Sequence, residues 1–320
     1  MVDREIEHPI GCGYGLLGLC CDSCLGGPCR RSPFDDDGGM VCGEDRDWMV
    51  ANNLMERVLR ESLQAMGSFR NSLEEASVPG TLGEAPRREE MKDLLSPFSR
   101  DGNRFLEAFY SKAAFPSLHA LGDPKGSWMT ELLDAAAGRP PATRDPEAIM
   151  ADALRLSAIA VAAEALSREL AGPAPGEDFT LPDTPSPLLV IVADKVDSPD
   201  TLRDSQLTAI AATCDNAARL YRLPNTAPLP AFARAVFAKW RIPLSMTGST
   251  AVVASSSLIR GLGALALGFS LASIPGYPIG GSARVEGYLT GQMRSDFGHA
   301  YLAIPPREDA AVAVLRSLTP

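Results

Sequence analysis

In the first half of the chain, apolar residues recur at the three- and four-residue spacing of amphipathic helices. This spacing predicts a helix over 45–66, which Asp45 can cap. A longer helix, rich in Ala and Leu, is predicted over 146–171. Its apolar stripe consists of Ile149, Ala153, Leu156, Ile159, Ala160, Ala163 and Leu166. Two shorter helices are predicted over 91–113 and 127–137. No strand is expected before residue 187, so the first half is predicted to be all-helical.

The pattern changes after a proline-rich stretch. Residues 172–187 contain five prolines and two glycines, and they mark the predicted boundary between a domain over 1–178 and a domain over 186–320. The run 188–193 is continuously apolar, which is typical of a strand buried in a parallel sheet. Further strands are predicted over 243–246, 270–274 and 300–304, and helices over 204–223, 251–267, 282–295 and 308–318. This alternation predicts a Rossmann-like parallel α/β domain, and the fold class is therefore α/β.

Six of the seven cysteines lie within 31 positions near the start of the sequence. Their spacing over 12–42 is C-x7-C-C-x2-C-x4-C-x12-C, and residues 26–28, Gly-Gly-Pro, stand between Cys24 and Cys29. Glycine and proline permit the tight turns that gather thiolates around an iron–sulfur cluster. The spacing therefore favours a cluster-binding loop over 12–42.

A [4Fe–4S] cubane needs four thiolates. A full set is available in Cys21, Cys24, Cys29 and Cys42. Cys12 and Cys20 remain as a pair, which a two-fold axis doubles to four, so a second cubane is expected between two copies of the chain. A zinc site and a disulfide framework are the alternatives. Zinc would leave two thiols without a role, and adjacent cysteines rarely both ligate one metal, so iron–sulfur clusters are preferred.

Charge and hydropathy limit the kinds of partner that the protein can bind. The net charge of −10, the pI near 4.9 and the lack of a Lys/Arg-rich run argue against nucleic acid. No apolar run reaches the roughly eighteen residues of a membrane-spanning helix. The first residues lack the basic-then-apolar layout of a signal peptide, and clustered thiolates require a reducing compartment. We expect a cytoplasmic protein that does not bind membranes.

Segment 12–30, with 41–45 (Val-Cys-Gly-Glu-Asp) and 51–54 (Ala-Asn-Asn-Leu), resembles the amino-terminal segment of the nickel-dependent, anaerobic carbon monoxide dehydrogenases. The resemblance implies that Cys12 and Cys20 hold a cluster shared across a homodimer axis. It also implies that the other four cysteines of the loop hold a [4Fe–4S] cluster within each subunit.

The second half is similar to the carboxyl-terminal Rossmann-like domain of the same family. The matching landmarks are 242–245, 268–274, 278–282 and 304–311. Members of usual length are about twice as long, and the middle region, which supplies most ligands of the family's nickel–iron–sulfur active site, has no counterpart here. Beyond the loop only Cys214 remains, in a segment similar to one that carries an active-site ligand. Cys214 is either a remnant metal ligand or a buried, inert cysteine.

The acid–base groups are sparse as well. Oxidation of CO needs a metal, a hydroxide source and a proton acceptor. The three histidines, His8, His119 and His299, are expected to have surface or structural roles, and 254–260 lacks the lysine found near the family's active site. One remaining thiolate cannot hold a nickel–iron cluster.

We therefore expect an iron–sulfur electron-transfer protein that works as a homodimer without nickel and does not oxidise CO alone. Its redox partner would be a ferredoxin or a separate catalytic subunit. Two alternatives remain: a carbon monoxide dehydrogenase-type oxidoreductase with a rearranged site involving Cys214, and a binding module whose clusters are structural.

Overall fold

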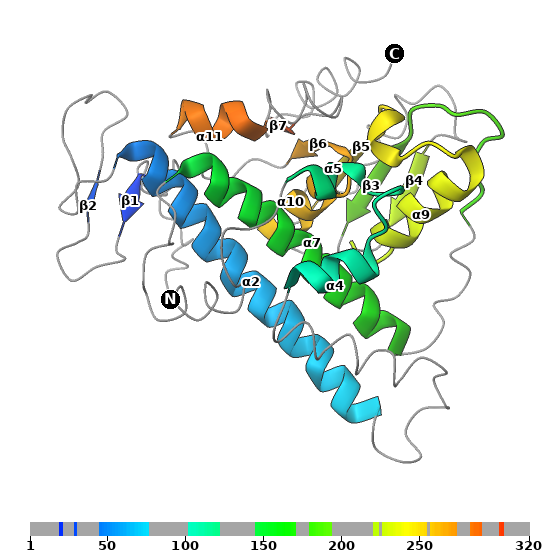
Figure 1. Ribbon diagram of the computed structural model, residues 1–320, viewed down its shortest axis with the longest axis horizontal. Helices are drawn as coiled ribbons and strands as arrows, with labels where there is room; N and C mark the ends of the chain where they lie inside the picture. Colours follow the sequence, from blue (N-terminus) through cyan, green and yellow to red (C-terminus); the bar gives the residue numbers. More distant parts are fainter. Residues whose placement is uncertain are drawn as a thin grey trace, which may run out of the picture.

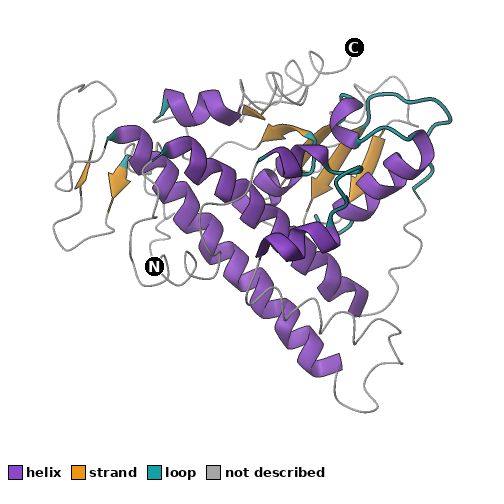
Figure 2. Cartoon of the chain, viewed as in Figure 1, coloured by secondary structure: helices purple, strands orange, loops and turns teal. Residues whose placement is uncertain are grey.

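The computed structural model describes residues 19–21, 29–30, 45–76, 102–121, 145–170, 179–193, 220–223, 226–254, 257–273, 282–289 and 301–303 (Figures 1 and 2). In chain order the elements are β1 (Cys20–Cys21), β2 (Cys29–Arg30), α2 (Arg46–Ala76), α4 (Gly102–Phe109), α5 (Pro116–Ala120), α7 (Pro146–Leu170), β3 (Leu189–Ala193), β4 (Leu220–Leu223), α9 (Leu229–Trp240), η2 (Leu244–Met246), β5 (Thr250–Ala254), α10 (Leu258–Ala266), β6 (Ser270–Ser273), α11 (Ala283–Gly287) and β7 (Tyr301–Ala303).

The second half of the chain forms a five-stranded parallel sheet. Its strand order is β4-β3-β5-β6-β7, which is 2-1-3-4-5 in chain order and corresponds to a doubly wound α/β arrangement. The strand β3 pairs on both sides, with Val190 opposite Tyr221 of β4 and opposite Ala251 of β5. The prediction of a parallel α/β sheet is therefore confirmed. From β3 the chain adds β4 on one side of the sheet and then β5 on the other, so the strand order reverses between β3 and β5. In doubly wound sheets, ligands usually bind at the carboxyl ends of the two strands at such a switch point.

Helices are stacked on this sheet, with α7 at the centre of the stack. The helix α10 lies against β5 and β6, α7 packs on α10, and α2 runs alongside α7 (Figure 1). Of the 25 residues of α7, 19 are buried, so this helix is covered on almost every side. That environment explains its composition, because a helix enclosed by other elements needs small and apolar residues all around. The predicted apolar stripe of α7 is buried in full.

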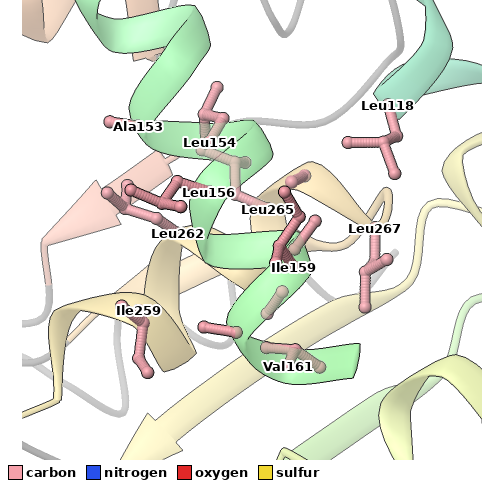
Figure 3. Close-up of a cluster of buried hydrophobic side chains, with 14 of the residues drawn as sticks. Leu118, Ala153, Leu154, Leu156, Ile159, Val161, Ile259, Leu262, Leu265 and Leu267 are labelled. Carbon is pink, nitrogen blue, oxygen red and sulfur yellow. The ribbon is translucent and has the colours of Figure 1, made fainter. Parts of the chain in front are cut away.

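One hydrophobic core runs from the helices into the sheet. Figure 3 shows its centre, where side chains of α7, such as Leu156 and Ile159, meet those of α10, such as Leu262 and Leu265. The same core includes Val190 of β3. Beside the edge strand β4, the ring of Phe232 in α9 makes edge-to-face contacts with the rings of Phe179 and Tyr221, and both centroid distances are 5.0 Å. The division into two domains stays a prediction, and the two parts share this core.

The close approach of α7 and α10 depends on Gly263. A Cβ atom at this position would lie 2.6 Å from Cγ2 of Val161 and 3.2 Å from the carbonyl oxygen of Ser157. We expect Gly263→Ala to lower the free energy of unfolding by about 1–3 kcal/mol, because the added methyl forces two core helices apart. Denaturant unfolding measures this.

The matched control for that substitution is Gly67→Ala in α2, where a Cβ atom would meet nothing within 4 Å. There alanine should raise the free energy of unfolding by about 0.5–1 kcal/mol, because glycine is a poor residue for a helix interior. Equal effects of the two substitutions would contradict the close α7–α10 packing.

Several sequence predictions are confirmed. The helix expected over 45–66 is α2, which begins where predicted and continues to Ala76, and the helix expected over 146–171 is α7. The strands expected over 188–193, 270–274 and 300–304 correspond to β3, β6 and β7. The described parts of 91–113 and 282–295 contain α4 and α11. The helices expected over 127–137 and 308–318 lie outside the described residues.

Other predictions are wrong. The segment expected as a strand over 243–246 contains the 3-10 helix η2, and the strand instead follows as β5, in residues that were assigned to a helix over 251–267. The end of the helix expected over 204–223 is the strand β4. The helix α9 was not predicted. The first half is not entirely helical, since β1 and β2 form a short antiparallel ladder. Among the helices described here, none is long and apolar enough to cross a bilayer.

Candidate iron–sulfur site

The described part of the cysteine loop is a small hairpin. Strands β1 and β2 pair in antiparallel register, with Cys21 opposite Cys29 and Cys20 opposite Arg30. Directly opposed residues of an antiparallel pair have Cα atoms only about 4.5–5.5 Å apart. The hairpin therefore brings two of the four predicted ligands of the subunit cluster together, although eight positions separate them in sequence.

The hairpin rests against the amino-terminal half of α2 (Figure 1). Leu19, which precedes β1, is fully buried in the hydrophobic core. Asn53 of α2 donates a hydrogen bond from Nδ2 to the backbone carbonyl oxygen of Cys20, at 2.5 Å. An apolar anchor and a polar anchor thus fix the position of β1 on the helix.

The start of α2 is fixed by the residue predicted to cap it. The backbone N–H of Trp48 donates to Oδ1 of Asp45 at 2.7 Å, and that of Met49 donates to the Asp45 carbonyl oxygen at 3.2 Å. A carboxylate also interacts favourably with the positive end of the helix dipole. Asp45 follows Cys42 by three residues, so this cap determines where the chain leaves the cysteine loop.

The other predicted ligands are not placed. Cys12, Cys24, Cys42 and Cys214 lie outside the described residues, as do His8 and His299. Within the described ranges no group of three or more His, Cys, Asp or Glu side chains is gathered as metal ligands would be. The third histidine, His119, has the structural role expected of it, because its Nε2 lies 2.8 Å from the carbonyl oxygen of Tyr110.

Two observations bear on whether these residues suit an iron–sulfur cluster. The ladder sets the backbone of Cys21 opposite that of Cys29, so two of the four predicted ligands are neighbours. In the first turn of α2, Trp48 is buried and its indole Nε1 has no hydrogen-bond partner among the described residues. A buried indole N–H without a partner can donate to a thiolate or a sulfide. Among the described residues, the pairing of Cys21 with Cys29 and this donor fit the group.

A polar cluster that the sequence did not reveal lies at the carboxyl end of β5. Glu61 of α2 accepts two hydrogen bonds at Oε2, from the hydroxyl of Ser257 at 3.0 Å and from the backbone N–H of Ile259 at 3.1 Å. Beside it, Glu164 of α7 pairs with Arg260 at 3.3 Å and accepts from the hydroxyl of Thr226 at 2.8 Å. Carboxylates from α2 and α7 thus bind the first turn of α10, at the edge where doubly wound sheets usually hold ligands.

Glu61 replaces the local cap that α10 lacks, since the side chain of Ser257 caps no backbone N–H of its own helix. We expect Glu61→Ala to lower the free energy of unfolding by about 1–2 kcal/mol, because it removes a helix cap and a favourable charge at the helix terminus. Urea unfolding measures the change.

Glu74, on the same helix, provides the control for Glu61→Ala. Among the described residues it pairs with Arg70, and both side chains are exposed, so Glu74→Ala should cost about 0.5 kcal/mol or less. If the two substitutions cost the same, Glu61 does not stabilise α10.

The sequence and the fold were both compared with known proteins. No protein-family model matches the sequence. The carbon monoxide dehydrogenase of Rhodospirillum rubrum is 50% identical over 48 residues, which are 15% of this chain and 8% of that protein. Carbon monoxide dehydrogenase 2 of Carboxydothermus hydrogenoformans is 48% identical over 53 residues, which are 16% of this chain and 8% of that protein. The solved structure of carbon monoxide dehydrogenase IV from Carboxydothermus hydrogenoformans matches with a TM-score of 0.70 and 11% identity, covering 97% of this chain and 94% of that chain.

The doubly wound parallel sheet, joined to paired helices with a cysteine hairpin beside them, is the fold shared with that solved structure. Over these short stretches the chain is similar in sequence to carbon monoxide dehydrogenases, and it shares its fold with carbon monoxide dehydrogenase IV. The stretches that match these curated relatives cover less than a tenth of the length of each relative.

Proposed function

We propose that this protein transfers electrons through iron–sulfur clusters and does not itself oxidise CO. In this proposal two copies form a homodimer with one [4Fe–4S] cluster in each subunit and one shared at the two-fold axis. The register of the hairpin, which opposes Cys21 and Cys29, is the observation that carries the proposal. Zinc remains disfavoured, because six cysteines exceed the four ligands of a structural zinc site.

The proposed ligands fall into two sets. The subunit cluster would be held by Cys21, Cys24, Cys29 and Cys42, and the shared cluster by Cys12 and Cys20 of each copy. Bound clusters of this kind supply one-electron chemistry at a potential set by burial and by hydrogen bonds to sulfur. The chain's own part would be to anchor the hairpin on α2 through Leu19 and Asn53 and to offer the partnerless indole N–H of Trp48 as a donor.

A catalytic centre is not part of the proposal. Near β5, the family's active-site lysine has no counterpart, and the described polar groups there are engaged with one another, as Glu61 is with Ser257 and Glu164 with Arg260. Cys214 alone supplies too few thiolates for a nickel–iron cluster. A donor and an acceptor must therefore come from outside the chain, as a ferredoxin or a separate catalytic subunit would.

Oxygen-free protein should first be titrated with a low-potential reductant while its visible absorbance and its low-temperature electron paramagnetic resonance are recorded. Reversible one-electron reduction of cubane clusters is expected. Clusters that cannot be reduced would refute electron transfer and support the structural alternative.

The same preparation should then be given CO and an oxidised viologen. No CO-dependent reduction of the dye is expected, and no nickel. Dye reduction by protein that contains nickel would refute the proposal and support a rearranged active site.

A further inference from the structure

We propose that Asn53 is a positioning residue for the clusters, through the peptide that joins Cys20 to Cys21. The inference rests on the proposed function, in which Cys20 is a ligand of the shared cluster and Cys21 is a ligand of the subunit cluster. This one peptide is then the shortest covalent link between the two clusters. Its carbonyl oxygen accepts the hydrogen bond from Asn53 Nδ2 at 2.5 Å.

The contact is long-range and specific to the hairpin. Asn53 lies 33 residues from Cys20 in the sequence and reaches it from the second turn of α2, which is itself packed along α7. On the other side of the same strand, β2 fixes the register of Cys20 and Cys21. The peptide between the two cysteines is therefore held by a rigid helix on one side and by a ladder on the other.

A donor to this carbonyl has an electrical as well as a steric effect. The hydrogen bond from Asn53 offsets part of the negative charge on the Cys20 carbonyl oxygen, which lies between the two proposed ligands in the chain. The potential of an iron–sulfur cluster depends on the charges and hydrogen bonds around it, because a less negative surrounding stabilises the added negative charge of the reduced state. Loss of the Asn53 amide should therefore make the clusters harder to reduce.

The chain offers a matched control in the neighbouring residue. Asn52 is also an asparagine of α2 and is 2% exposed, but its Nδ2 donates to Oε1 of Glu56 within the same helix, at 3.1 Å. Leucine at either position removes one amide of the same helix without a change in charge. Only Asn53→Leu removes the donor to the Cys20 carbonyl.

The experiment compares wild type, N53L, N53Q and N52L as full-length, oxygen-free proteins with their clusters bound. Iron and sulfide are quantified, and the reduction potentials are measured by a mediated titration followed by electron paramagnetic resonance. N53L should shift the cluster potentials to more negative values, N53Q should restore them towards wild type because it keeps an amide donor, and N52L should leave them unchanged.

Fully loaded N53L with wild-type potentials would overturn the inference, as would an equal shift in N52L. If N53L does not load its clusters, recovery of loading in N53Q supports the role of the donor, whereas failure of N53Q beside a loaded N52L overturns it. A wild-type protein without iron would instead refute the proposed function, so the two failures are distinguishable.

Discussion

Replacing Cys21 and Cys29 together with alanine should remove about four of the roughly six irons bound per chain. The hairpin places these two residues opposite each other, so the double variant deletes one side of the subunit cluster's ligand set. The shared cluster, held by Cys12 and Cys20, should keep the remaining two or so irons per chain. Iron and sulfide assays on protein prepared without oxygen measure the loss.

Cys214→Ala is the matched control, because it removes a thiol from outside the cysteine loop. It should leave the iron content unchanged if Cys214 is a buried, inert cysteine, and the far-ultraviolet circular dichroism of both variants should match wild type. A double variant that retains about six irons would contradict the assignment of Cys21 and Cys29.

The second large effect is expected in the core of the helical layers, at a buried ion pair on α7. Arg155 donates from Nη1 to Oδ1 of Asp152 and from Nη2 to the carbonyl oxygen of Leu121, and the two side chains are only 5% and 10% exposed. Burial raises the pKa of Asp152, and the Arg155 guanidinium counteracts this. Asp152→Ala should lower the free energy of unfolding by about 3–5 kcal/mol, because it leaves a buried guanidinium without its counter-charge.

Denaturant unfolding of wild type, Asp152→Ala and a double variant, Asp152→Leu with Arg155→Met, separates charge from packing. The double variant should be close to wild type in stability, since replacing a whole buried pair by apolar residues of similar size is often neutral or stabilising. Asp152→Ala could lower the free energy of unfolding by less than about 1 kcal/mol, or the double variant could be less stable than Asp152→Ala. Either result would contradict the claim that Asp152 stabilises the fold by neutralising the buried Arg155.

Where the sequence predicted the fold correctly, local pattern and tertiary burial agree. The helix α7 was predicted because its small and apolar residues continue for seven turns, and it is buried almost throughout. The helix α2 was predicted to end at residue 66, just before Gly67 and Ser68, but it continues to Ala76, and Phe69 and Leu73 in the added part are buried. The low helix propensity of Gly67 is outweighed there by the burial of the apolar side chains that follow it.

The errors cluster where the segments are short. Thr250–Ala254 is five residues of Thr, Ala and Val, and such a run does not distinguish a buried strand from the start of a helix. Pairing with β3 and β6 decides it, and that pairing is a tertiary property. The helix α9 was not predicted, and its two prolines, Pro228 and Pro230, stand at the helix start, where proline is tolerated.

For the site, the sequence predicted the cysteine ligands, and the structure added the contacts that hold part of the cysteine loop in place. Cysteine spacing alone predicted a cluster-binding loop over 12–42 and two sets of thiols within it. It could not predict that Cys21 lies opposite Cys29, nor that Asn53 reaches the Cys20 carbonyl, because both depend on how the chain folds back. The contacts of Glu61 with Ser257 and Ile259 join residues almost 200 positions apart, and no local pattern indicates them.

The most direct test of the account is the native mass of the protein, purified without oxygen, together with its iron, sulfide and nickel content. A homodimer that holds three cubanes should contain about twelve irons and about twelve sulfides and no nickel, and Cys12→Ala with Cys20→Ala should remove about four of those irons. A colourless monomer, or an iron content that stays the same after Cys12 and Cys20 are replaced, would contradict the claim that these cysteines bind a cluster between two copies of the chain.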